Sequence, residues 1–412
     1  MKTRNYHVKG QKRGMMAAAV ACLAAIFVTA AGGASRGRAL PAADGTKPVP
    51  PKYDVAALVY PGYHPDPRWQ KELGIFHEGI GEWQNVKEAK PKWKGHYQPR
   101  QPLWGFENEA DPKVMEKKIE AASSHGVNVF IFDWYWYGGR PFLEDALREG
   151  FLGAKNNAKM KFFLMWANHN FSDGCNNKVS RKNDRVRLSG AVDKDGFRVM
   201  SKRVIDLFLS RPNYYRIGGK PVFMIYEPSS FVDGMGGMEN AAAALRMFDD
   251  DCKAAGLGGV HLMACSWGKC KPAHVAALGI ESATMYTYAH HVRPRGDYAS
   301  WAAKGLAKLD SEKARLSGLK AYFGHVSVGW DTNPRYPEVL KDVVNSTPAD
   351  FEKALRCVKD WCDRNTPPGY PKLITINAWN EWIEGSYLEP DTRFKFGYLE
   401  AVKRIFSSAE EE

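Results

Sequence analysis

Short apolar runs, rich in β-branched and aromatic residues, recur along the chain and alternate with longer amphipathic stretches. Each run has the length of one buried strand. Eight of them occur, at residues 54–60, 127–134, 161–167, 221–227, 260–265, 282–288, 322–330 and 372–379. Helical patterns lie between most of these runs, at 111–126, 197–211, 239–256 and 348–365. The pattern therefore predicts strands that alternate with helices.

Continuous apolar strands separated by helices indicate a parallel sheet that is covered on its outside. Eight such units are the number that closes a barrel, so we predict the α/β class and a (β/α)8 TIM barrel. A doubly wound open sheet is the alternative, but no Gly-rich phosphate turn follows the first run. Residues 61–110 lack a clear helical pattern and are expected to form a long loop after the first strand.

The N-terminus has the three parts of a secretory signal peptide, and we assign it to residues 1–34. A basic stretch is followed by an apolar run at 15–31 and by small residues at 32–34. The Pro-rich segment 35–52 is interpreted as a linker, and 53–406 as a single catalytic domain. We expect a secreted or periplasmic protein. A retained N-terminal membrane anchor is the alternative, because the apolar run is close to the lower limit for a span.

Composition narrows the classes of function. The chain has 412 residues, of which 44% are hydrophobic and 12% aromatic, and this excludes a disordered chain or a multi-span membrane protein. The net charge of +12 is partly due to five basic residues within the first 34. No Lys/Arg block with interleaved aromatic residues occurs elsewhere, so no nucleic-acid partner is predicted.

Six cysteines follow the signal peptide, and their even number permits disulfides in an exported protein without fixing the pairs. They are Cys175, Cys252, Cys265, Cys270, Cys357 and Cys362. Cys265 and Cys270 lie in CSWGKC, which is not a zinc-binding spacing and is interpreted as a local bridge or as packing. No metal ion and no other cofactor is predicted.

The active site of a TIM barrel is built at the carboxyl ends of its strands. Aromatic rings, amides and carboxylates follow most of the predicted strands, and this mixture is typical of a carbohydrate site. Rings that merely seal the top of the barrel are the alternative. The candidate substrate-binding residues are Tyr63, His64, Asp133, Trp134, Trp136, Trp166, Asn168, His169, Tyr226, Glu227, Tyr288, Trp330, Asp331, Trp379, Asn380 and Trp382.

Glu381 and Glu384 are the candidate catalytic residues. They lie three residues apart where the eighth strand ends, and one helical turn would place both carboxylates on the same side. Trp379 and Trp382 bracket them. Glycosidic cleavage requires such a pair, with one acid for the leaving oxygen and a second group as base or nucleophile.

Six segments of the chain resemble the glycoside hydrolase family 99 group and, more closely, its WbsX-like relatives. The most specific is AWNEWIEGSYLEPD at 378–391, and GEWQNVKEAKPKWKGHYQPRQP at 81–102 is nearly as specific. The others are VNVFIFDWYWYGGR, FFLMWANHN, YYRIGGKPVFMIYEPS and GWDTNPR. The resemblance implies an endo-acting, metal-independent (β/α)8 hydrolase of α-linked glycan, with mannose as the family preference.

The resemblance also implies a retaining route in which the 2-OH of the sugar attacks its own anomeric carbon. Glu381 would remove the 2-OH proton, and Glu384 would be the acid. This sequence departs from the usual pattern at His169 and Glu227. Both positions fall in the expected cleft, so the mannose preference does not carry over directly.

Two other functions compete with that of an exported hydrolase. WbsX-like proteins are often labelled glycosyltransferases, but a transferase would need a cytoplasmic nucleotide-sugar donor. The nearest acidic group for such a donor, residues 249–251, lies in a helical pattern. The third hypothesis is a non-catalytic glycan-binding protein, which the paired glutamates argue against.

The signal peptide generates the first prediction. The processed chain should begin near residue 35 and lie outside the cytoplasm. N-terminal sequencing of protein from fractionated cells measures this. An intact Met1 on soluble cytoplasmic protein would contradict it.

Overall fold

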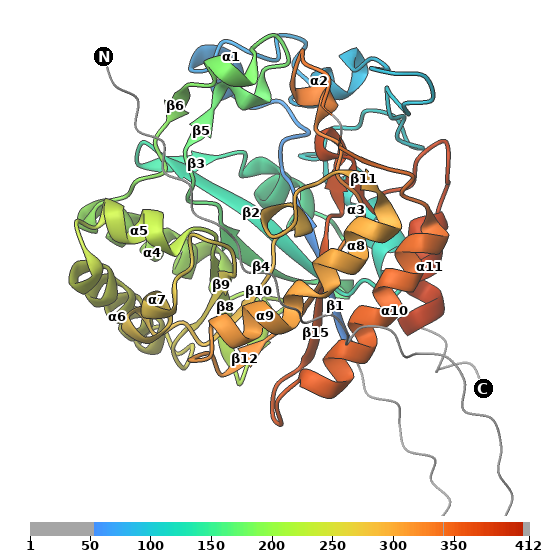
Figure 1. Ribbon diagram of the computed structural model, residues 1–412. Coiled ribbons are helices and arrows are strands. Elements are labelled where there is room, and N and C mark those ends of the chain that lie inside the picture. The colour runs from blue at the N-terminus through green and yellow to red at the C-terminus, as the bar shows by residue number, and fades with distance from the viewer. Residues whose placement is uncertain (1–52, 341, 407–412) are drawn as a thin grey trace, which may run out of the picture. The chain divides into compact units, whose positions relative to one another are not determined.

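The computed structural model describes residues 53–340 and 342–406 (Figure 1). The assigned signal peptide and linker therefore lie outside the described residues. No helix within the described ranges has the length and apolar character that a membrane crossing requires.

Parallel strands form a nearly closed barrel, which confirms the predicted (β/α)8 fold. β12 and β13 are the two ends of the sheet path, but Phe323 alone separates them along the chain, so together they act as the seventh strand. The strands in spatial order are β12 (Ala321–Tyr322), β10 (Ser282–Thr284), β9 (His261–Cys265), β8 (Lys220–Ile225), β4 (Lys161–Trp166), β2 (Val129–Tyr137), β1 (Tyr53–Val59), β15 (Lys372–Asn377) and β13 (Gly324–Ser327).

The apolar runs form strands because both of their faces are covered. All nine residues of β2 are buried, some inside the barrel and the others beneath the outer helices. The register pairs Asp133 of β2 with Met165 of β4 and Trp134 with Trp166, the last residue of β4, while β2 continues to Tyr137. The side chains after these strands therefore meet at one end of the barrel.

Each of the four predicted helices is present. Asp111 caps the first of them, and its side chain accepts a hydrogen bond from the Lys113 backbone N–H at 2.9 Å. These helices are α3 (Pro112–Ser123), α4 (Lys194–Val204), α6 (Met238–Ala254) and α10 (Pro348–Asn365). The remaining outer helices are α5 (Pro228–Gly234), α7 (Pro272–Leu278), α8 (Tyr298–Leu306), α9 (Lys308–Arg315) and α11 (Gly397–Phe406). The ring of Phe406 in α11 lies 5.2 Å from that of Tyr53 in β1.

The long first loop differs from the prediction because it contains two short helices, α1 (Pro67–Lys71) and α2 (Trp83–Glu88). Helices of five and six residues are too short to show an apolar period in the sequence. Short strands also lie at the carboxyl end of the barrel. They include β5 (Phe171–Ser172) with β6 (Val186–Leu188), and β16 (Asn380–Glu381) with β17 (Ser386–Tyr387).

All six cysteines of the described residues are free, and Cys357 alone among them is exposed. Cys265 and Cys270 are both buried and unbonded, so packing is the correct interpretation of CSWGKC and a local bridge is not. Burial raises the pKa of the Cys270 thiol to about 12, which keeps it protonated and unreactive.

Candidate active site

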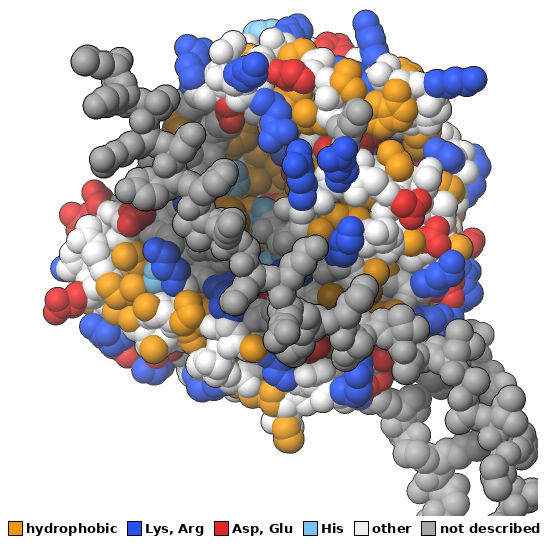
Figure 2. All heavy atoms as spheres, in the orientation of Figure 1, with side chains coloured by type: hydrophobic (Ala, Val, Ile, Leu, Met, Phe, Trp, Pro, Cys, Tyr) orange, Lys and Arg blue, Asp and Glu red, His pale blue; other side chains and the backbone are white. Residues whose placement is uncertain are grey.

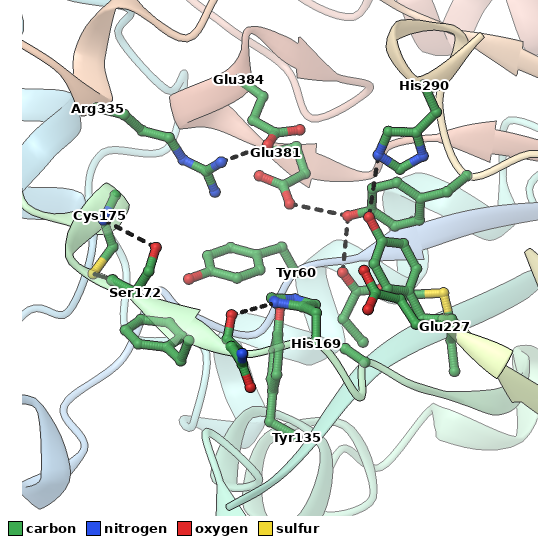
Figure 3. A pocket seen from close by; sticks show the side chains of 18 of the residues that line it. Tyr60, Tyr135, His169, Ser172, Cys175, Glu227, His290, Arg335, Glu381 and Glu384 are labelled. Atoms are coloured by element: carbon green, nitrogen blue, oxygen red, sulfur yellow. Dashed lines mark hydrogen bonds and ion pairs between the residues drawn. The ribbon is translucent and has the colours of Figure 1, made fainter. Parts of the chain in front are cut away.

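A cavity of about 540 Å³ lies at the carboxyl end of the barrel. Residues that follow several different strands line it, as expected for this fold. Of the predicted site residues, the cavity wall contains Asp133, His169, Tyr226, Glu227, Trp330, Glu381 and Glu384. Figure 3 shows Glu381 and Glu384 projecting into the cavity on the same side as Arg335.

A short hairpin and a tight turn position the two glutamates. Glu381 ends β16, and residues Trp382–Glu384 form a single 3₁₀ turn in place of the expected α-helical turn. Gly385 then reverses the chain with a φ of +64°. A Cβ atom there would lie 2.7 Å from Nη2 of Arg100 and 2.9 Å from Cβ of Asp331. Both the conformation and the close approach therefore require glycine at this position.

Tyr286 links Glu381 to Asp133. Its hydroxyl oxygen lies 3.0 Å from Oδ2 of Asp133 and 3.3 Å from Oε1 of Glu381. A hydroxyl has one proton to donate, so both contacts are hydrogen bonds only when one of the carboxyl groups is protonated. Burial raises the pKa of both Asp133 and Glu381 well above the ordinary range, which favours that state.

Glu384 has a cationic partner. Nη1 of Arg335 lies 2.7 Å from Oε1 of Glu384. Burial raises the pKa of Glu384, and Arg335 opposes that shift. In the unliganded site, Glu381 therefore holds a proton more readily than Glu384 does. The nearby charge of Glu384 reinforces this difference, since it further raises the pKa of Glu381.

Three carboxyl oxygens in the cavity have no hydrogen-bond partner within the described part of the chain. They are Oδ1 of Asp133, Oε2 of Glu381 and Oε2 of Glu384. Buried polar atoms are nearly always satisfied, by protein, water or ligand. These oxygens are therefore positioned to accept hydrogen bonds from the hydroxyl groups of a polar ligand.

A buried ion cluster lies behind the hairpin that carries Glu381. The Lys118 ammonium on α3 lies 2.5 Å from a carboxylate oxygen of Glu109 and 2.5 Å from one of Glu389. Nδ2 of Asn380 donates to Glu109 at 2.9 Å, and Nε1 of Trp382 donates to Glu389 at 2.6 Å. The residues on both sides of Glu381 are thus tied to one buried cation.

Asp331 organises a second cluster, outside the cavity. Its Oδ2 atom accepts from Nε2 of Gln98 at 2.8 Å, and Nε2 of His96 and Nη2 of Arg100 lie 2.9 and 3.2 Å from it. His96 and Arg100 hold the pKa of Asp331 well below its usual range. The backbone N–H of Asp331 donates to the Glu384 carbonyl at 2.5 Å. The first loop therefore supports the loops of Arg335 and Glu384.

Several predicted binding residues do not line the cavity, because side chains alternate along a strand. On β2, Asp133 and Tyr135 face the cavity, whereas Trp134 and Trp136 stack on each other outside it. Trp134 donates to Glu144 at 2.9 Å. Three other predicted tryptophans also pack elsewhere: Trp166 against Phe231, Trp379 against Phe130, and Trp382 against Tyr387. These rings therefore pack against neighbouring aromatic side chains and do not line the cavity.

Several of the other predicted residues that lie outside the cavity wall form hydrogen bonds that hold loops in place. Asn168 exchanges two hydrogen bonds with the backbone of Glu227, at 2.8 and 2.9 Å. Asn380 does the same with the backbone of Tyr60, at 2.7 and 2.8 Å. The Tyr63 hydroxyl accepts from the Trp382 N–H at 3.1 Å, and Tyr288 donates to the His325 carbonyl at 2.8 Å. His64 is fully buried, and Asp331 belongs to the cluster described above.

The structure adds wall residues that the candidate set omitted, including Tyr60, Tyr135, Trp267, Tyr286, His290, Arg335 and Tyr336. Trp267 and His290 stack with ring centroids 4.4 Å apart, and Nε2 of His290 lies 3.1 Å from the Tyr226 hydroxyl. A strict alternation from Asp133 would have selected Tyr135 over Trp134. Trp267, two residues after the end of β9, was recognisable by the same rule.

The sequence of this chain matches a known protein family. The family model described as glycosyltransferase WbsX matches residues 55–402. An uncharacterized protein, WxcX, from two strains of Xanthomonas campestris pv. campestris is 27% identical over 375 residues, which cover 86% of this chain and 50% of the relative. The chain thus spans about half the length of the curated relatives it matches.

Solved structures resemble the fold. An endo-alpha-mannosidase of glycoside hydrolase family 99 from Bacteroides thetaiotaomicron has a TM-score of 0.57 at 13% identity, covering 86% of this chain and 98% of that one. A glycoside hydrolase-like protein has a TM-score of 0.57 at 15% identity, covering 89% and 97%. The barrel is therefore of the type seen in family 99.

The Lys118 cluster generates the second prediction. Lys118→Met leaves two carboxylates buried without their cation, and this should lower the free energy of unfolding by about 3–5 kcal/mol. Urea denaturation measures the loss. The control is Lys117→Met on the same helix, because Lys117 pairs with Glu107 nearer the surface and should cost less than about 1 kcal/mol. Equal small losses in both variants would contradict the assigned role of Lys118.

Proposed function

The chain belongs to the WbsX glycosyltransferase family, and from this premise we propose that it is a glycoside hydrolase acting within α-linked glycans. The observation that carries the proposal is the pair Glu381 and Glu384, which is buried in the cavity with two oxygens free for a ligand. Paired carboxyl groups of this kind supply the acid and the base of glycosidic cleavage. The fold shared with family 99 supports the same reaction class.

In the proposed reaction, Glu381 removes the proton from the 2-OH of the sugar, and that oxygen displaces the leaving group from the anomeric carbon. Glu384 protonates the leaving oxygen. Water then opens the 1,2-anhydro sugar with retention of configuration. This assignment needs an ionised Glu381 and a protonated Glu384, which is the reverse of the distribution favoured in the unliganded site.

A movement of Arg335 would exchange the protonation states of Glu381 and Glu384. The Arg335 guanidinium interacts electrostatically with the carboxyl groups of Glu384, Glu82 and Glu381. If glycan binding moves Arg335 from Glu384 toward Glu381, the pKa of Glu384 rises and that of Glu381 falls. Glu82, whose pKa burial raises to about 7, is a further carboxyl group available to this cation. The proposed mechanism therefore includes this movement of Arg335 when the glycan binds.

A glycosyltransferase is the second candidate, because the family description names that activity. The acidic group considered for a nucleotide-sugar donor, residues 249–251, lies on α6. Asp249 there accepts from the Val260 N–H at 2.8 Å and pairs with Lys253. None of these three residues lines the cavity. We also propose export of the protein, on the basis of its N-terminal sequence, which is consistent with a hydrolase of external glycan.

The third prediction tests the two glutamates. Glu381→Gln and Glu384→Gln should each lower turnover on a cleavable α-linked polysaccharide by roughly 100-fold or more. Release of reducing ends measures this, and Glu400→Gln on the exposed face of α11 is the control. Near-normal activity of both cavity variants would place the catalytic pair elsewhere.

The fourth prediction separates the acid from the base and the anhydro route from other routes. An α-glycosyl fluoride needs no protonation of its leaving group, so Glu384→Gln should retain most activity on it while Glu381→Gln does not. The fluoride whose reacting sugar lacks the 2-OH should not be cleaved. Recovery by Glu381→Gln instead would exchange the two roles. Efficient cleavage of the 2-deoxy substrate would refute the anhydro sugar.

A further inference from the structure

A second hollow lies beside the main cavity and continues from it. Asp184 lines both, and the neighbouring residues Tyr336 and Pro337 line the main cavity and the second hollow respectively. The segment joining β5 to β6 forms most of its wall. A glycan chain cleaved at an internal bond must extend beyond the reacting sugars, and this hollow is a path that it can take.

The two hollows differ in charge. The main cavity contains several carboxyl groups and one arginine, whereas the second hollow is lined by Lys178, Lys182 and Arg185 against a single carboxylate, Asp184. Figure 2 shows Lys and Arg side chains distributed over the whole displayed face, with Asp and Glu side chains among them. The change in sign along a continuous path would distinguish the parts of a bound chain.

The cations of the second hollow are available to a ligand. Lys178 and Lys182 are exposed, and within the described ranges neither ammonium forms an ion pair. Arg185 uses Nε to contact Oδ2 of Asp173 at 3.1 Å, while its side chain stays 78% exposed. This contact orients the guanidinium and leaves its terminal N–H groups free. Such a fork is suited to a carboxylate.

We propose that the second hollow binds the carboxylate of a uronic acid residue, so that the substrate is an acidic α-linked glycan. The inference rests on the proposed function for the idea that a glycan occupies the main cavity. The carboxyl groups of that cavity repel an acidic sugar at the reacting position, whereas the second hollow attracts one a short distance along the chain. Charge thereby sets the register of the substrate as well as its class.

Affinity electrophoresis tests the proposal independently of catalysis. Gels contain either an α-linked polysaccharide in which uronic acid residues alternate with neutral sugars, or the same polymer after carboxyl reduction, and every protein carries Glu384→Gln to prevent cleavage. We expect roughly tenfold stronger retardation by the acidic polymer, the combined effect of three exposed ion pairs, and weaker retardation as salt rises. The variant Lys178→Ser/Lys182→Ser/Arg185→Ser should lose this preference.

The control removes the same charge elsewhere. Lys155, Lys304 and Lys308 are exposed, and none of them lines either hollow. The triple serine variant at these positions should keep the preference for the acidic polymer. Equal retardation by both polymers, an unaffected hollow variant, or equal loss in the control would overturn the inference. The proposed function is assessed separately, by release of reducing ends from α-linked glycans with the unchanged protein, and failure of that assay alone would count against it.

Discussion

Removing carboxyl groups from water is costly, and the carboxyl end of this barrel is organised around that cost. Glu109, Glu389 and Asp331 are buried in contact with cationic partners, and these contacts make them fixed points for the surrounding loops. Glu381 and Asp133 are buried with a shared tyrosine hydroxyl and without a cation in contact. The first group holds the loops in place, whereas no contacting cation fixes the protonation state of the second group.

Glu384 lies between these two situations. Arg335 partly compensates its burial, yet one carboxylate oxygen remains free. A cation near three carboxyl groups can favour a different one when a ligand enters, so a small displacement of one side chain changes where a proton resides. The buried ion clusters behind the glutamates and the cation beside Glu384 are complementary parts of the same arrangement.

The barrel was predictable because each strand is a local apolar run and each helix is marked by its own caps and period. The Glu381–Glu384 pair was equally local. The residues of the cavity wall were harder to predict, because the sequence of a run such as 133–136 does not show which of its two faces points inward. The Lys118–Glu389 contact joins residues far apart in sequence, and no local pattern signals it. The short helices of the first loop were missed because their stability comes from contacts with other loops.

The contact between Tyr53 and Phe406 brings the two ends of the barrel domain together at the amino ends of its strands, on the side opposite the cavity. A domain with adjacent ends can be inserted into, or joined to, a longer polypeptide through one small attachment region. The architecture of a larger protein can then change without altering access to the mouth of the barrel. That separation of attachment from access would let one hydrolase-type barrel occur in chains of very different length.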